Sequence, residues 1–167
     1  ADLVHALGVT VLNGHRTLVA AHDKLATANA LFAAGVPHPR TVHVAPWLDL
    51  VRKLGLLIGA LSPELPDSLV VQVQGELASE EVGVLRLSAL RGLFSAVIED
   101  QVTFVNAPAL AAERGVEAEL TTATESPNHR SVVDVRAVYP EGAVVNVAGT
   151  LSGPQLVEKI VQINGRN

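Results

Sequence analysis

Apolar side chains recur every three or four residues in parts of this chain, which is the spacing of an amphipathic helix. Pro46 suits the start of the first such segment, because the first backbone N–H groups of a helix have no partner within it. Gly115 suits the end of the last one, where a left-handed residue commonly closes a helix. The predicted helices span residues 46–61, 80–98 and 108–114.

Elsewhere apolar and polar side chains alternate, which indicates β-strands with one face in water. The sequence Tyr139-Pro140-Glu141-Gly142 lies between two such runs and predicts a hairpin turn. We therefore expect an α+β fold, an antiparallel sheet with helices packed on one face. The predicted strands span residues 69–77, 116–123, 131–138, 143–151 and 155–163, the last at an edge of the sheet.

The same periodicities predict which side chains form the core. Residues that fall on the apolar side of each element should be buried together. Aromatic residues make up only 3% of the chain, so this core must be aliphatic. The side chains expected in it are Val71, Val73, Leu85, Leu93, Val97, Val145 and Val147.

The first 45 residues differ from the rest in pattern and charge. They predict a strand–helix–strand segment, with strands over 8–13 and 41–44 and a helix between them. Residues 1–44 hold three basic and two acidic residues, whereas the remainder holds nine basic and fifteen acidic ones. We therefore predict two parts, residues 1–45 and 46–167.

Composition excludes several classes of function. The net charge of −5 disfavours nucleic-acid binding, which needs clustered lysine and arginine. The absence of cysteine excludes disulfides, zinc–thiolate sites and thiol catalysis. Neither an apolar stretch of about 18 residues nor a secretory signal pattern is present, so we expect no membrane partner and a cytoplasmic location.

Motifs of self-contained enzymes are also missing from the sequence. No two glycines are separated by one residue, no Gly-Lys pair exists and His-Glu-x-x-His is absent. We therefore expect no cofactor and no catalytic residues. His15 and His22 lie two helical turns apart and could share a face with His5. A metal site needs a third ligand of fixed geometry and second-shell partners, so we interpret these histidines as structural or solvated and expect no metal site.

Three groups of polar residues remain as candidate binding sites. Lys24, after Asp23 at a helix start, suits either phosphate binding or a solvated ion pair. The loop 126–131, with His129 and Arg130, suits either ligand contacts or an ordinary hairpin connection. Lys159 and Arg166 could contribute to an anion site, with a solvated edge strand as the alternative.

Five stretches of the second part carry a resemblance to a known family, namely residues 46–55, 84–106, 107–116, 126–136 and 159–166. Through them, residues 46–167 closely resemble the intervening domain of the long bacterial form of D-3-phosphoglycerate dehydrogenase. In that family the domain lies between the catalytic domains and a C-terminal small-molecule-binding domain. The resemblance implies allosteric binding of substrate or another anion, contacts between subunits, and no dehydrogenase activity in this part.

The resemblance also bears on the anion site. Lys159 matches a lysine of the family's anion site, and the arginines that complete that site would lie beyond Asn167. The implied ligand is a small phosphorylated or carboxylate anion. Together with the edge strand, the family's subunit contacts lead us to expect a homo-oligomer.

Residues 11–13, 23–27 and 34–41 carry a second resemblance, to a different family. Through them, residues 1–44 resemble the strand–helix segment that precedes the nucleotide site in the glutamate-ligase branch of ATP-grasp ligases, and Lys24 would match a nucleotide-contacting lysine. The glycine-rich loop and the magnesium carboxylates of that family do not follow. A chimera joined near residues 44–46 accounts for both resemblances, with a natural fusion as the alternative.

The sequence thus predicts a non-catalytic regulatory or anion-binding module. A purely structural chimera without a ligand is the alternative, and a fragment of an ATP-dependent ligase is a more distant one.

Overall fold

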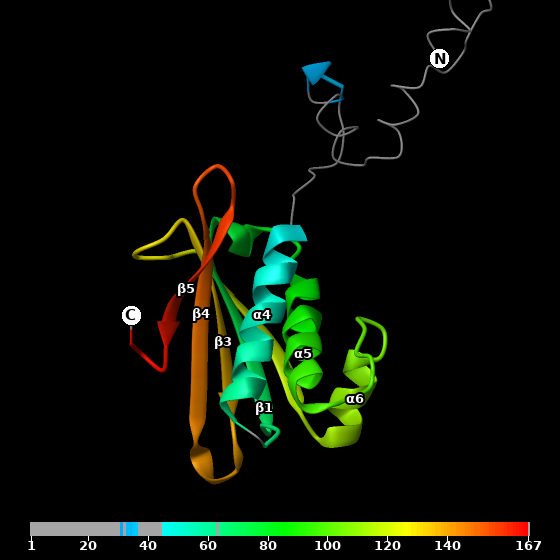
Figure 1. Cartoon of the computed structure of the whole chain (residues 1–167). Helices are drawn as coiled ribbons and strands as arrows, with labels where there is room; N and C mark the ends of the chain where they lie inside the picture. Colours follow the sequence, from blue (N-terminus) through cyan, green and yellow to red (C-terminus); the bar gives the residue numbers. More distant parts are fainter. Residues whose placement is uncertain (1–30, 32, 37–44, 63, 167) are drawn as a thin grey trace, which may run out of the picture. The chain divides into compact units, whose positions relative to one another are not determined.

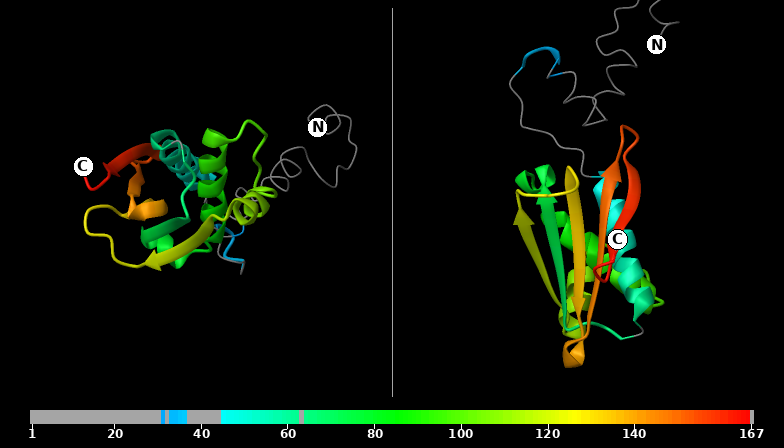
Figure 2. Two further views of the ribbon diagram at one scale, coloured as in Figure 1. Left: turned by 90° about the horizontal axis from the view of Figure 1, so that it is seen from below. Right: turned by 90° about the vertical axis from the view of Figure 1, so that its left-hand side faces the viewer.

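Alternating strands and amphipathic helices assemble into a five-stranded sheet with its helices on one side (Figures 1 and 2). The computed structural model describes residues 31, 33–36, 45–62 and 64–166. The chain divides into two units, Ala1–His43 and Val44–Asn167, and the fold described below belongs to the second. The predicted N-terminal strand–helix–strand segment falls almost entirely outside the described residues.

The described elements follow the predicted order. Each predicted helix and strand from residue 45 onward is present, with ends shifted by a few residues. The elements are α4 (Ala45–Leu61), β1 (Ser68–Gly75), η1 (Glu76–Ser79), α5 (Gly83–Val97), α6 (Ala107–Arg114), β2 (Glu117–Ala123), β3 (Ser131–Val138), η2 (Pro140–Gly142), β4 (Val144–Ser152) and β5 (Val157–Ile163).

The strands lie in the order β2-β1-β3-β4-β5, with β5 at one edge. The predicted hairpin between β3 and β4 is confirmed, and three of the four strand pairs are antiparallel. The pair β1–β2 is parallel, which the sequence did not predict. Between these strands the chain passes through α5 and α6, and such a long crossover returns the next strand in the same direction. The predicted α+β fold is confirmed.

Glycines bring α4 and α5 unusually close together on the covered face of the sheet. A Cβ atom added at Gly92 would lie 2.0 Å from the Arg52 carbonyl oxygen, and one at Gly55 would lie 2.1 Å from the Ala89 carbonyl oxygen. Both distances are far below van der Waals contact, so only glycine allows this backbone approach. Figure 1 shows the two helices side by side along their length.

The core lies between these helices and the sheet. Of the seven predicted core residues, Val71, Val73, Leu85, Leu93 and Val147 are buried. Val97 and Val145 are only partly buried, which corrects the prediction for these two positions. Val97 is the last residue of α5 and Val145 is the second residue of β4, so each lies near the end of its element, where fewer neighbouring residues can cover it.

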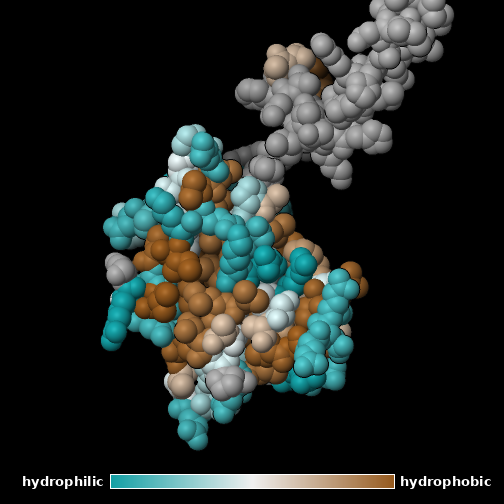
Figure 3. Space-filling model, in the orientation of Figure 1, coloured by the Kyte–Doolittle hydropathy of each residue, from teal (hydrophilic) through white to brown (hydrophobic). Residues whose placement is uncertain are grey.

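Apolar side chains also reach the surface around β5 and toward α4 (Figure 3). The exposed fractions are 53% for Ile160, 38% for Ile163 and 48% for Leu61. An edge strand with exposed apolar residues can pair with another chain. Among the helices of the described part, none combines the length and the apolar character that crossing a bilayer would require.

Candidate functional site

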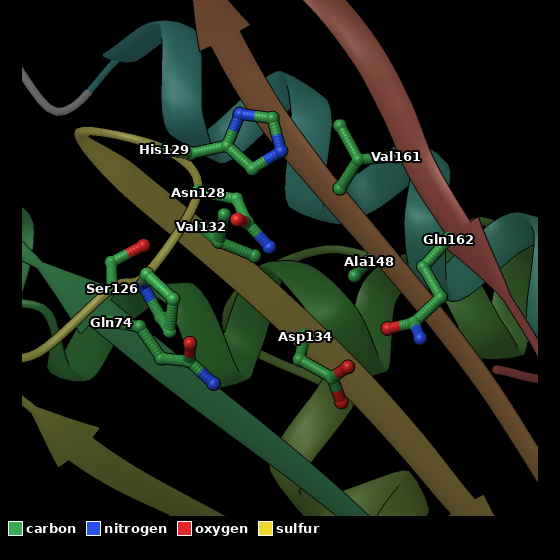
Figure 4. A pocket seen from close by; sticks show the side chains of 10 residues that line it. Gln74, Ser126, Asn128, His129, Val132, Asp134, Ala148, Val161 and Gln162 are labelled. Atoms are coloured by element: carbon green, nitrogen blue, oxygen red, sulfur yellow. The ribbon is translucent and has the colours of Figure 1, made fainter. Parts of the chain in front are cut away.

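The face of the sheet opposite the helices is hollowed near the loop that joins β2 to β3. This hollow, which we call the trough, has a volume of about 590 Å³. The loop forms one wall, β5 forms the other, and β1, β3 and β4 lie beneath (Figure 4). The residues that line it are Gln74, Ser126, Pro127, Asn128, His129, Val132, Asp134, Ala148, Val161 and Gln162.

Strand register explains why these side chains share one face. Asp134 on β3 pairs with Ala148 on β4, which in turn pairs with Gln162 on β5. Residues directly opposite each other in an antiparallel pair project to the same side of a sheet. One row of side chains across three strands therefore points away from the helices into the trough.

An irregularity between β4 and β5 shapes the second wall. Ala148 pairs with Gln162 and the next residue, Gly149, pairs with Ile160, so Val161 is an extra residue on β5. Such a bulge re-aims the side chains around it. Val161 lines the trough together with Gln162, its immediate neighbour in sequence (Figure 4).

Asp134 lies partly buried in the trough. The side-chain amide Nδ2 of Asn146 donates to its two carboxylate oxygens, at 2.6 and 2.7 Å. Burial raises the pKa of Asp134, because a desolvated carboxylate is harder to ionise, while the Asn146 hydrogen bonds and the charge of Arg136 act in the opposite direction.

The predicted loop residues have different surroundings. His129 is exposed and lines the trough. Arg130, the next residue, is also exposed, and its Nε donates to Oε2 of Glu76 at 2.7 Å. The guanidinium is thus engaged by a carboxylate outside the trough, and only His129 of this pair belongs to the trough lining.

The predicted C-terminal residues are also separate. Lys159 is exposed and pairs in register with Thr150, on the open face two residues along β4 from Ala148. Arg166 is exposed beyond a two-residue turn, where the Ile163 and Arg166 backbones exchange two hydrogen bonds of 2.9 Å. It borders a second hollow with residues 160–164. His129 and Lys159 therefore share the open face, whereas the four predicted residues do not form one cluster. Lys24 lies outside the described residues.

Sequence reasoning did not identify Asp134, Gln74 or Gln162 as candidate site residues. Their alternation placed them on a polar face, but a polar face alone does not indicate a hollow. The available signal was Asp134, the one acidic residue in a strand of otherwise mostly apolar residues. Within the part of the chain that the structure describes, no group of three histidine, aspartate or glutamate side chains is placed to hold a metal ion.

Comparison with known proteins gives a single, consistent result. The family model for the D-3-phosphoglycerate dehydrogenase intervening domain matches residues 43–164. A D-3-phosphoglycerate dehydrogenase of Mycobacterium leprae is 80% identical over 125 residues, which is 75% of this chain. The enzyme of Mycobacterium tuberculosis strain H37Rv is similar to the same extent, and that of Bacillus subtilis is 25% identical over 124 residues.

The matched region is a limited part of each relative. The chain spans 24% of the length of the two mycobacterial enzymes and 23% of the Bacillus subtilis enzyme. The resemblance predicted for residues 46–167 is thus confirmed.

Proposed function

The chain belongs to the D-3-phosphoglycerate dehydrogenase intervening-domain family, and from this premise we propose that it is a non-catalytic regulatory module that binds a small phosphorylated or carboxylate anion. The observation that carries the proposal is the exposed ammonium of Lys159 on the open face of the sheet. Its resemblance to a lysine of the family's anion site supplies the expected ligand class.

The surroundings of the two described lysines favour Lys159 over Lys53 as the residue that binds the anion. Lys53 forms ion pairs with Asp49 and Glu158, whereas within the described residues no carboxylate pairs with Lys159. The charge of Lys159 is therefore available to a ligand. Arg166 is a candidate second cation in the complex, and His129 is a hydrogen-bond donor on the same face.

The expected affinity is low. Exposed ion pairs contribute about 0.2–1 kcal/mol each, so one or two surface cations should bind an anion at millimolar concentration or weaker. Salt should weaken this binding steeply, because the Debye length falls to about 8 Å at physiological ionic strength.

Calorimetric titration with 3-phosphoglycerate and with inorganic phosphate tests the proposal. The variant Lys159→Ala should lose binding, whereas the matched control Lys53→Ala removes an already paired lysine and should bind as the parent does. Equal binding by the parent and Lys159→Ala would refute the site. Absence of binding by the parent would favour the alternative of a purely structural protein.

We extend the proposal to catalysis and assembly. The relatives are named as dehydrogenases, yet the chain spans 24% of their length, so we propose that it does not turn over 3-phosphoglycerate by itself. A nicotinamide absorbance assay showing turnover would contradict this. The exposed apolar residues of β5 support a homo-oligomer, and light scattering that finds a monomer at high micromolar concentration would refute it.

For residues 1–45 we propose an origin in an ATP-grasp ligase, joined to the second part as a chimera. Its support is the sequence resemblance, the change in charge and the start of the family match at residue 43. We expect no ATP binding by this segment, since the rest of that site is not in the sequence. Saturable binding of ATP with magnesium that Lys24→Ala abolishes would instead favour the ligase-fragment alternative.

A further inference from the structure

The trough combines an apolar floor with polar side chains around it. Val132 and Ala148 form the floor and are only 8% and 3% exposed, and Val161 adds an apolar wall. The loop residues Asn128 and His129 lie opposite β5, across the trough (Figure 4). Such a mixture of apolar surface with a few polar groups is typical of small-molecule sites.

The charges of the lining side chains favour one class of ligand for this trough. Asp134 is the one carboxylate among its lining residues, and neither lysine nor arginine is among them. Figure 4 shows Asp134 at the end of the trough that lies away from His129. An anion here would face Asp134 at short range, whereas a cation would add to the compensation that Arg136, outside the lining, gives to this partly desolvated charge.

The carboxylate also keeps capacity to accept hydrogen bonds. It offers about four lone-pair positions, and the hydrogen bonds from Asn146 use two of them. Gln74 lies on the same face, and its Nε2 donates to Gln72 at 3.1 Å, which leaves its Oε1 as a further acceptor. A primary ammonium carries three N–H donors, so acceptors of this kind match it.

We propose that the trough is a binding site for a small primary amine, with the ammonium on Asp134 and the apolar body over Val132, Ala148 and Val161. The site is distinct from the proposed anion site, because it selects the opposite charge and Lys159 is not among its lining residues. It also does not depend on the proposed function, since it rests on the side chains of the trough alone.

Nuclear magnetic resonance titration of the full chain tests this site with two probes of one shape. Isoamylamine is an ammonium ion at pH 7, and isoamyl alcohol has the same branched body without the charge. Isoamylamine should shift the backbone amides of Val132, Asp134, Ala148 and Gln162 in a saturable manner. The alcohol should bind at least about tenfold more weakly, because its hydroxyl can still donate a hydrogen bond to Asp134 but carries no positive charge to pair with the carboxylate.

Two variants test whether amine binding requires the negative charge of Asp134. Asp134→Asn keeps the side-chain shape and should weaken isoamylamine binding at least about tenfold, as the charge-assisted contact is lost. The control Asp67→Asn makes the same change at an exposed aspartate just before β1, at the opposite end of this strand from Gln74, and should leave binding unchanged. Gln162→Lys, on the edge strand, introduces a cation in the wall and should weaken binding similarly while Asp134 itself is unchanged.

Equal affinity for amine and alcohol would overturn the proposal, as would unchanged amine binding in folded Asp134→Asn or Gln162→Lys. Lys159→Ala separates this site from the anion site, because it should leave isoamylamine binding intact.

Discussion

The two faces of strand β3 have different surroundings in this protein. On β3, Val133, Val135 and Ala137 are fully buried against the helices, while Asp134 and Arg136 project from the other face. The covered face is packed so closely that glycines are required between its helices. The open face carries the trough and Lys159. Changes on the covered face should therefore alter stability, and changes on the open face should alter binding.

The largest effect is expected at the centre of the covered face. Leu93→Ala removes a fully buried side chain of α5 and should lower the free energy of unfolding by about 2–5 kcal/mol through the cavity it leaves. Val84→Ala, on the same helix but 37% exposed, is the control and should cost much less. Urea denaturation of both variants measures the difference, and equal costs would show that Leu93 is not a core residue.

The helix contact should give the next largest effect. Gly92→Ala places a methyl group 2.0 Å from the backbone oxygen of Arg52, so α4 and α5 must move apart. Overpacking of this kind costs about 1–3 kcal/mol, and sometimes more. The control Gly83→Ala adds a methyl group with no atom within 4 Å at the start of the same helix. Thermal unfolding that is unchanged in Gly92→Ala would contradict the close packing.

A smaller, pH-dependent effect is expected on the open face. Because burial raises the pKa of Asp134, the folded state holds this proton more tightly than the unfolded state does. The stability that Asp134 contributes in its protonated form is therefore fully present below the ordinary aspartate pKa. It is lost as the pH rises through the raised pKa. Arg136, which favours the ionised form, is the charge that acts on it, and Asn146 is its hydrogen-bond partner.

Asp134→Asn should remove this dependence and become slightly more stable than the parent at neutral pH. Thermal unfolding of both proteins between pH 3 and pH 8 measures the difference. A parent protein whose stability rises relative to the variant over this range would show that the pKa of Asp134 is lowered instead.

The smallest stability effect should accompany Lys159→Ala. Its side chain is exposed and forms no ion pair with the described residues, so unfolding should change by less than about 0.5 kcal/mol. Thermal unfolding and anion titration of the same sample separate the two properties. A large loss of stability would show that Lys159 supports the fold and would weaken the proposed role in binding.

Periodicity explains why the elements were predictable and the trough was not. The alternation in residues 131–138 indicated both a strand and its two faces, because side-chain direction depends on local sequence. The parallel direction of β2 and the bulge at Val161 depend on how distant segments meet. The contact between Arg130 and Glu76 likewise joins residues 54 positions apart, which local spacing cannot reveal.

The most direct test of the division between the faces is to titrate 3-phosphoglycerate into the full chain and record the backbone amide shifts. We predict saturable shifts at Lys159, Thr150 and neighbouring residues of β4 and β5, with α4 and α5 nearly unaffected. Shifts centred on the two helices, or none up to tens of millimolar, would contradict the account.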